Sequence, residues 1–284
     1  ITISKLVPLA LFIAIGIFFI NGANFTPVFP QDVYVDGSFA QAAVLLFFAY
    51  TGFEVIAIAA EDMKNPKKNL PRAIIMCMLL VSVLYMAILA VSIGVLGTDL
   101  ANTKAPVQDA FNVIVGPVGM YIVLVGTLIS MGGINFAEAY YAPRVATSMA
   151  EDGMLPSALA KRNRYNAPYV AAIVTAIASV LLAWSGSFTT LAAISAVSRF
   201  TQYLPTCLAV IIFRRKWADK ARSYTIPGGY LIPVIAIGTS LWMLAQAQTN
   251  QLLWGLGGCI VILPFYYSYW KKKKAGLIKD HDEM

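Results

Sequence analysis

The chain has 284 residues, of which 59% are hydrophobic and 12% are charged, and its 21 basic and 14 acidic side chains give a net charge of +7. Soluble domains carry about 25% charged residues, so this composition excludes an ordinary soluble enzyme. It also excludes an intrinsically disordered chain, and three cysteines in so apolar a sequence exclude a disulfide-stapled secreted module. Repeated apolar stretches of about 20 residues, the length that crosses a bilayer as a helix, predict an all-α polytopic membrane protein.

Eight apolar segments follow one another along the chain. They are longer than the roughly 10-residue strands of a transmembrane β-barrel and lack the alternation of such strands. Lipid also requires every backbone polar group to be paired internally, which favours helices. We therefore expect eight membrane-spanning helices, over residues 3–20, 39–58, 73–96, 118–149, 169–184, 191–213, 230–246 and 252–270.

The basic residues predict how these helices cross the membrane. Seventeen of the 21 lie after the second, fourth, sixth and eighth segments, and cytoplasmic connections carry such an excess of Lys and Arg. The C-terminus is therefore expected in the cytoplasm, and the first segment should run outward. The four lysines at 271–274 belong to the same pattern, so we expect them to face anionic lipid at the inner leaflet and expect no nucleic-acid partner.

The second segment contains a glycine and an acid, Gly52 and Glu54, in the middle of an apolar run. Glycine weakens a helix by about 1 kcal/mol relative to alanine, and a glutamate near the bilayer centre costs several kcal/mol unless it is paired, protonated or hydrated. Both together predict a discontinuous helix whose freed backbone groups face a cavity, as in secondary transporters. The alternative is a kinked scaffold helix in which a protonated Glu54 bonds a neighbour.

Three separated motifs resemble one family in order along the chain. YTGFE…AAEDMKNPKKNLPRAI at 50–74 resembles the sixth helix and following loop of amino acid–polyamine–organocation (APC) superfamily permeases. APRVATSMAEDGMLPSALAKRNRYNAP at 142–168 resembles the eighth helix and its loop, and ISAVSRFTQYLPTCLAVIIFRR at 194–215 resembles the tenth. The resemblance covers essentially the whole chain.

This resemblance implies an APC-type inverted-repeat fold, with two five-helix repeats and two additional helices. The chain opens inside an apolar stretch and without Met, so we expect the C-terminal portion of a longer protein, helices five to twelve, with helices one to four missing. Within a single transmembrane domain over 1–284, residues 1–20 would be the last helix of the first repeat and 39–213 the second repeat. Residues 230–270 would form the two additional helices and 271–284 a cytoplasmic tail.

The implied activity is secondary-active amino-acid transport across the plasma membrane by alternating access, coupled to protons. Its partners would be an amino acid or amine substrate, a proton or counter-substrate, and the lipid bilayer. An exchanger, a transporter of polyamines or other amines, and a non-transporting sensor remain as alternatives. A channel would need a continuous polar lining, and few polar residues repeat along any segment.

The resemblance also implies roles for the residues around the predicted break. In the family, carbonyl groups here take the ammonium group of the substrate and aromatic side chains close over it. The matching substrate-binding positions are Phe48, Ala49, Tyr50, Thr51, Gly52 and Phe53. Phe48 and Phe53 could equally be packing aromatics, and Glu54 matches an acid linked to gating and coupling.

Lys5 stands where proton-coupled members of the family have a fifth-helix lysine. An apolar site favours the neutral form of a lysine, which lets it cycle a proton; the alternative is a lysine that snorkels to the inner interface. Asn135 and Glu138 share one face of the fourth segment and are further candidates for the substrate site. Glu138 could pair with Lys5, with a cationic substrate group, or with a basic residue outside this chain. Arg144 and Arg199 are expected to be buried scaffold arginines that are paired or that reach a helix end.

No motif indicates an enzyme. The sequence lacks GxxxxGK[ST], HExxH and any paired nucleophile and base, so we expect no catalytic residue, no cofactor and no metal. The cysteines, Cys77, Cys207 and Cys259, stand singly in apolar segments and are expected to be small core residues.

Overall fold

A computed structural model describes residues 2–27, 38–60, 63–218, 222, 224–225 and 228–274. Helices are the only regular elements within these ranges. The chain forms two compact units, one made of Ile1–Val35 with Ala73–Glu138, the other of Asp36–Arg72 with Ala139–Met284.

The first unit is built around an aromatic core. Its elements are α1 (Thr2–Gly16), η1 (Ile17–Phe19), η2 (Gly22–Phe25), most of α3 (Pro66–Leu96), η4 (Gly97–Asn102), α4 (Pro106–Val115) and the first part of α5 (Pro117–Glu151). Phe12 of α1 meets Phe111 of α4 edge-on, with ring centroids 5.6 Å apart. Both rings are fully buried, together with Val91 of α3 and Val123 of α5, so four helices share one core.

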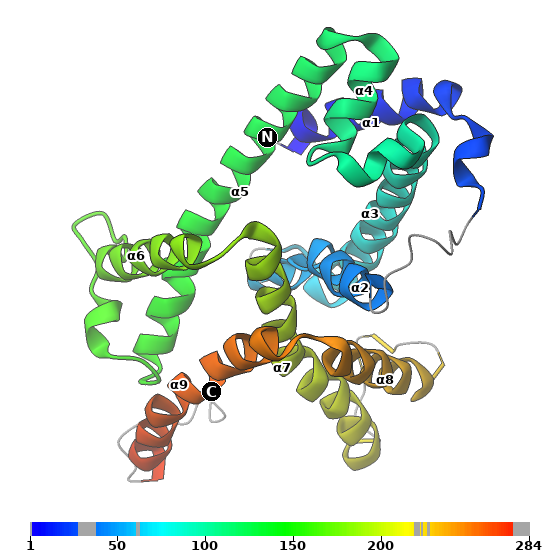
Figure 1. Ribbon diagram of the computed structural model, residues 1–284. Coiled ribbons are helices and arrows are strands. Elements are labelled where there is room, and N and C mark those ends of the chain that lie inside the picture. The colour runs from blue at the N-terminus through cyan, green and yellow to red at the C-terminus, as the bar shows by residue number, and fades with distance from the viewer. Residues whose placement is uncertain are drawn as a thin grey trace. The chain divides into compact units, whose positions relative to one another are not determined.

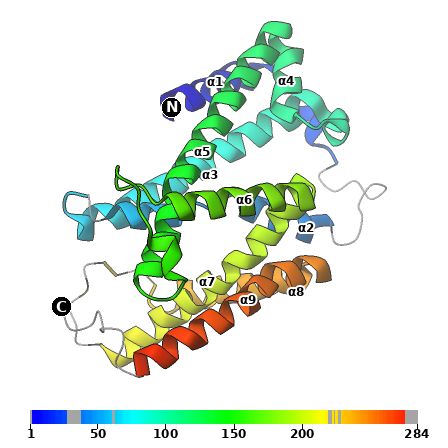
Figure 2. The same ribbon diagram turned by 90° about the vertical axis from the view of Figure 1, so that its left-hand side faces the viewer.

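The second unit is built around α7 (Phe188–Lys216), which packs against α2 (Ser38–Ala49), α8 (Leu231–Gln246) and α9 (Thr249–Lys274) (Figures 1 and 2). Its other elements are η3 (Phe53–Ala60), the end of α5, η5 (Ser157–Ala160) and α6 (Tyr169–Ser185). Small residues let helices approach closely in membrane proteins. Here a side chain added at Gly255 of α9 would lie 2.7 Å from Val197 of α7, and the Ser198 hydroxyl donates to the Gly255 carbonyl at 3.0 Å.

Each of the eight predicted segments is helical, but they differ in length. Within the described ranges, five helical segments are long and apolar enough to cross a membrane: 38–56, 66–102, 117–151, 188–216 and 249–271. The three shorter apolar helices cover Leu6–Phe19, Tyr169–Ser185 and Leu231–Gln246. The longest of these has 17 residues, about 25 Å at 1.5 Å per residue, against a hydrocarbon core of about 30 Å. Their crossing of the membrane stays a prediction.

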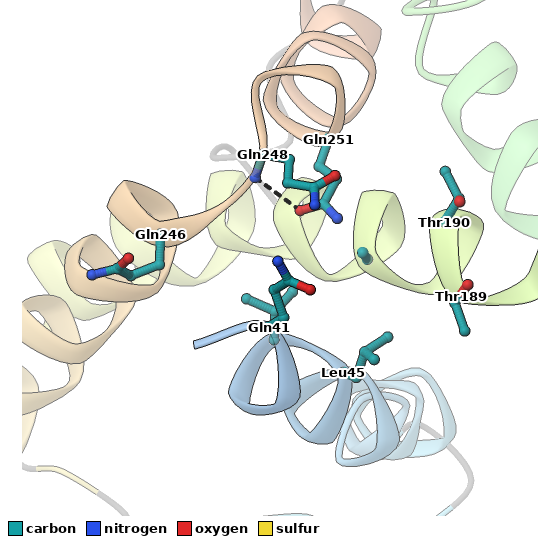
Figure 3. Close-up of a pocket in the computed structure, with 9 residues that line it drawn as sticks. Gln41, Leu45, Thr189, Thr190, Gln246, Gln248 and Gln251 are labelled. Atoms are coloured by element: carbon teal, nitrogen blue, oxygen red, sulfur yellow. Dashed lines mark hydrogen bonds between the residues drawn. The ribbon is translucent and has the colours of Figure 1, made fainter. Parts of the chain in front are cut away.

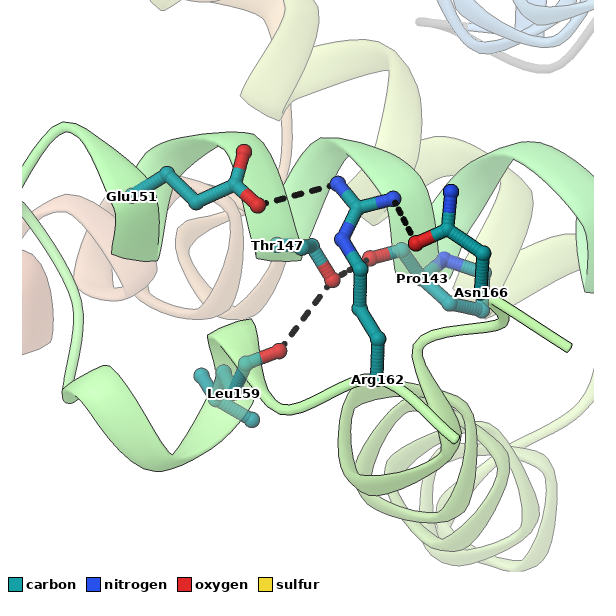
Figure 4. A network of polar contacts seen from close by, with 6 residues as sticks. All are labelled: Pro143, Thr147, Glu151, Leu159, Arg162 and Asn166. Atoms are coloured by element: carbon teal, nitrogen blue, oxygen red, sulfur yellow. Dashed lines mark hydrogen bonds and ion pairs between the residues drawn. The ribbon is translucent and has the colours of Figure 1, made fainter. Parts of the chain in front are cut away.

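A hydrogen bond and an ion pair connect the segment that follows α5 to that helix (Figure 4). The Thr147 hydroxyl, 1% exposed, lies 2.8 Å from the Pro143 carbonyl oxygen and 3.1 Å from that of Leu159. One turn further along, Glu151 forms an ion pair with Arg162 at 2.9 Å. These contacts fix the connection between α5 and α6, within the motif at 142–168.

Replacing Thr147 with valine should destabilise the protein by about 1–2 kcal/mol, because the half-buried Leu159 carbonyl loses a hydrogen-bond donor while the side-chain shape is kept. The measurement is the thermal unfolding temperature of the detergent-purified protein. Thr239→Val is the matched control, since the exposed Thr239 hydroxyl bonds only carbonyls of its own helix. Equal unfolding temperatures for the two variants would contradict this role of Thr147.

Candidate functional site

The second membrane-spanning segment is interrupted at its centre. α2 ends at Ala49, residues 50–52 form a turn, and the chain continues as the 3-10 helix η3 from Phe53. The amide of Thr51 donates to the Phe48 carbonyl at 3.0 Å, and the Thr51 hydroxyl donates to the same oxygen at 2.7 Å. Gly52 has a φ of 105°, a backbone conformation that glycine adopts readily. The predicted discontinuity is thus confirmed, and its local cause is the pair Thr51 and Gly52.

Glu54 is held by three groups just beyond this turn. One carboxylate oxygen accepts the Gly52 amide at 2.9 Å and the Tyr203 hydroxyl at 3.2 Å, while the other pairs with the guanidinium of Arg199. The Glu54 side chain is only 16% exposed and that of Arg199 is 30% exposed. The positive charge of Arg199, on α7, compensates the negative charge of Glu54 and so offsets the desolvation free energy of an acid in an apolar span. We call Glu54, Arg199 and Tyr203 the carboxylate cluster.

Aromatic side chains on both sides of the break pack against α7. Before it, the Phe47 ring stacks on Phe200 with centroids 4.6 Å apart, and Phe48 meets Phe188 edge-on at 6.2 Å. After it, the Phe53 ring lies 5.9 Å from that of Tyr203. Phe48 and Phe53 therefore pack against α7; contact of either ring with substrate stays a prediction.

The other predicted site residues lie in the first unit or outside the described side chains. Asn135 and Glu138 are exposed on α5, and the Asn135 side-chain amide donates to the Met131 carbonyl of its own helix at 3.0 Å. The backbone of Lys5 belongs to α1, but its side chain lies outside the described residues, as do His281 and the side chain of Cys259. Within the second unit, Phe48 to Glu54 lie together with Arg199 and Tyr203. A role for Lys5, Asn135 and Glu138 in the same site remains a prediction.

The two arginines expected in the scaffold differ. Arg199 is paired as predicted, whereas Arg144 is exposed rather than buried, and its guanidinium bonds the Tyr140 carbonyl at 2.7 Å and covers the Tyr140 ring at 3.5 Å. A polar group four residues away on its own helix satisfies Arg144, so it needs no buried partner. Tyr203 was missed among the site residues. Its spacing of four from Arg199 places both on one face of α7, which is the available sequence signal.

The site offers electrostatic and hydrogen-bonding groups rather than reactive ones. No group of three His, Cys, Asp or Glu side chains that could hold a metal occurs in the described ranges. The break places the C-terminal end of α2, which carries a partial negative charge, beside a compensated carboxylate. This arrangement suits a bound cation such as an ammonium group. Long apolar helices, one of them broken at such a site, define the class of multi-pass membrane transporters.

Comparison with known proteins identifies the family. A family profile described as "Amino acid permease" matches residues 1–269. The chain belongs to the amino acid permease family, which consists of transporters and not of enzymes.

Several bacterial transporters are similar along nearly the whole chain. The branched-chain amino acid permease BcaP of Bacillus subtilis (strain 168) is 29% identical over 277 residues, which cover 95% of this chain and 58% of that protein. The methylthioribose transporter of the same organism is 29% identical, with 96% and 59% covered, and its serine/threonine exchanger SteT is 28% identical, with 96% and 64% covered. The chain thus spans about three fifths of these relatives, mostly in their C-terminal portion.

Proposed function

We propose that the protein is a secondary-active transporter that moves an amino acid across the plasma membrane by alternating access. The observation that carries this proposal is the interruption of the α2–η3 span at residues 50–52, beside the ion-paired Glu54. A broken helix at the centre of an apolar span supplies polar backbone groups to a substrate where lipid-exposed irregular backbone is not tolerated. Membership of the amino acid permease family supports the same function.

In this proposal the turn and its flanks bind the ammonium group of the substrate. The negative end of α2 attracts the cation, and the substrate-binding positions are Phe48, Ala49, Tyr50, Thr51, Gly52 and Phe53. The Phe48 carbonyl already accepts two hydrogen bonds from Thr51, so an ammonium group would displace one of them. Asn135 and Glu138 would add polar groups from α5, and the carboxylate cluster would hold η3 in place.

The proposed fold is the inverted-repeat arrangement of the family. Residues 39–213 would form the second five-helix repeat, preceded by the last helix of the first repeat at 1–20. Residues 230–270 would add two helices, with residues 271–284 on the cytoplasmic side. The excess of Lys and Arg after alternate spans supports this orientation.

An amino-acid exchanger is the second candidate, because a serine/threonine exchanger matches 96% of this chain over 64% of its own length. Import with protons and exchange differ in what drives the flux. Uptake of a labelled amino-acid mixture into proteoliposomes that contain the complete gene product separates them. Stimulation by an inward proton gradient supports the first, and a requirement for internal amino acid supports the second. No saturable uptake of amino acids under either condition would contradict both and favour polyamines or other amines, or a sensor.

Lys5→Ala is expected to abolish stimulation of uptake by a proton gradient while leaving exchange against internal amino acid. The reason is that a lysine in an apolar site can bind and release one proton per cycle, and alanine cannot. Uptake measured across a series of external pH values checks this. Lys104→Ala is the control, since Lys104 is exposed between η4 and α4; an unchanged pH profile in Lys5→Ala would exclude coupling by Lys5.

A further inference from the structure

A polar pocket lies in the unit built around α7, at the helix ends away from the basic clusters (Figure 3). It has a volume of about 210 Å³ and is lined by the start of α2, the start of α7, the end of α8 and the start of α9. The far ends of α7 and α9 carry Arg214 to Lys216 and Lys271 to Lys274. Since basic clusters mark the cytoplasmic side, the pocket belongs to the outer side.

Carboxamides dominate the lining. Gln41 projects from α2, Gln246 ends α8, and Gln248 and Gln251 face Gln41 from the connection to α9 and its first turn (Figure 3). The Gln251 side-chain oxygen accepts the Gln248 backbone amide at 3.1 Å. Gln41, Gln246 and Gln248 are exposed, and among the residues the structure describes their carboxamides bond no other protein group, so they are open to a ligand. Each offers two donor hydrogens and an acceptor oxygen.

No charged residue lines this pocket. A ligand with a formal charge would lose hydration without gaining a counter-charge, which is costly. Hydroxyl groups each donate and accept, as carboxamides do, so clustered hydroxyls match the lining. The volume is below the range of about 300–1,000 Å³ found for drug-sized ligands, which limits the ligand to one small group.

Aromatic residues place the pocket near the membrane surface. Trp242 lies one turn before Gln246 in α8, and its ring is 6.3 Å from that of Phe39 at the start of α2. Trp254, 73% exposed, lies one turn after the pocket in α9. Tryptophan concentrates at the level of lipid headgroups. The pocket therefore opens at a depth that lipid headgroups and dissolved molecules both reach.

We propose that the Gln41–Gln251 pocket binds an uncharged polyhydroxylated group, such as a sugar ring or a glycerol unit. The source is either the headgroup of a membrane glycolipid or a free sugar, since the same hydroxyl chemistry serves both. This site is separate from the proposed substrate site, because its lining shares no residue with Phe48 to Glu54 or with the carboxylate cluster.

The test compares the wild-type protein with Gln41→Leu/Gln251→Leu in two binding measurements. In the first, the complete gene product is extracted from vesicles that contain glucosyl diacylglycerol, and bound glycolipid is quantified by native mass spectrometry. In the second, free glucose is titrated and the unfolding temperature is followed. Loss of two hydrogen bonds predicts about ten-fold weaker binding in the variant.

Gln108→Leu is the matched control, because Gln108 lies in α4 of the first unit and outside this pocket. Gln41→Glu/Gln251→Glu keeps the side-chain size, adds charge and should also weaken binding. Glycolipid retention that only the pocket variants lose indicates a headgroup site, and a glucose-dependent shift lost in the same variants indicates a soluble ligand. Equal behaviour of wild-type and pocket variants in both measurements would overturn the proposal, as would a pocket-dependent preference for charged phosphatidylglycerol or for free amino acids.

Discussion

Arg199→Met should abolish amino-acid uptake and lower the stability of the protein by about 2 kcal/mol. The substitution removes the cation that pairs with Glu54, leaving the carboxylate with the Tyr203 hydroxyl and the Gly52 amide. The Glu54 side chain is 16% exposed, so water replaces the lost partner only in part. The turn at residues 50–52 and the start of η3 then lose their anchor on α7, and the proposed substrate site loses its shape.

Uptake into proteoliposomes and the thermal unfolding temperature in detergent measure these two effects. Arg144→Met is the matched control, because Arg144 is exposed and contacts Tyr140 of its own helix. The double variant Glu54→Gln/Arg199→Met removes both charges and should regain stability while transport stays lost, because the pairing that positions the break is still absent. Wild-type uptake and stability in Arg199→Met would exclude the ion pair as an anchor of the site.

Gly52→Ala should reduce uptake by about five-fold or more through the backbone alone. Gly52 has a φ of 105°, and a Cβ added there meets no atom within 4 Å. The cost is therefore conformational strain, about 1–3 kcal/mol for a side-chain-bearing residue, and 1.36 kcal/mol corresponds to a ten-fold change in rate. The chain relieves this strain by moving the turn that carries the proposed substrate-binding residues.

Gly238→Ala tests whether any added methyl group has this effect. Gly238 lies inside α8 in the same unit, and its added Cβ also meets nothing within 4 Å. Alanine favours a helix by up to about 1 kcal/mol over glycine, so this variant should transport normally and unfold at the same or a higher temperature. If Gly52→Ala and Gly238→Ala transport equally well, the conformation of Gly52 has no part in function.

The sequence is sufficient to predict the helices and the break, because both depend on local composition. Apolar stretches without charges locate the helices to within a few residues, and Gly52 beside Glu54 locates the interruption. The third segment was expected to begin at residue 73, but α3 already begins at Pro66. Asn65 has a φ of 51°, and its backbone carbonyl accepts hydrogen bonds from the amides of Lys68 and Asn69. Pro66 follows it, and proline suits the first position of a helix.

Features that depend on distant residues were not predictable in the same way. Glu54 meets Arg199 and Tyr203 across about half of the chain, and hydropathy contains no information on which arginine pairs with which acid. The sequence does not predict α4, because its ten residues are too few for a membrane span and the polar residues Gln108, Asp109 and Asn112 interrupt its apolar ones. Gln41 and Gln251 line the same pocket because α2 and α9 both pack against α7.

Substrate protection of an introduced cysteine at the break tests the central claim most directly. Thr51→Cys in a protein whose native cysteines are replaced by serine would be labelled with a maleimide, with and without a saturating amino-acid mixture; Thr239→Cys on α8 is the control. Slower labelling of Cys at position 51 in the presence of amino acids, with no change at position 239, is the predicted result. Equal labelling rates at position 51 with and without substrate, in a protein that transports, would show that the broken helix does not line the amino-acid site.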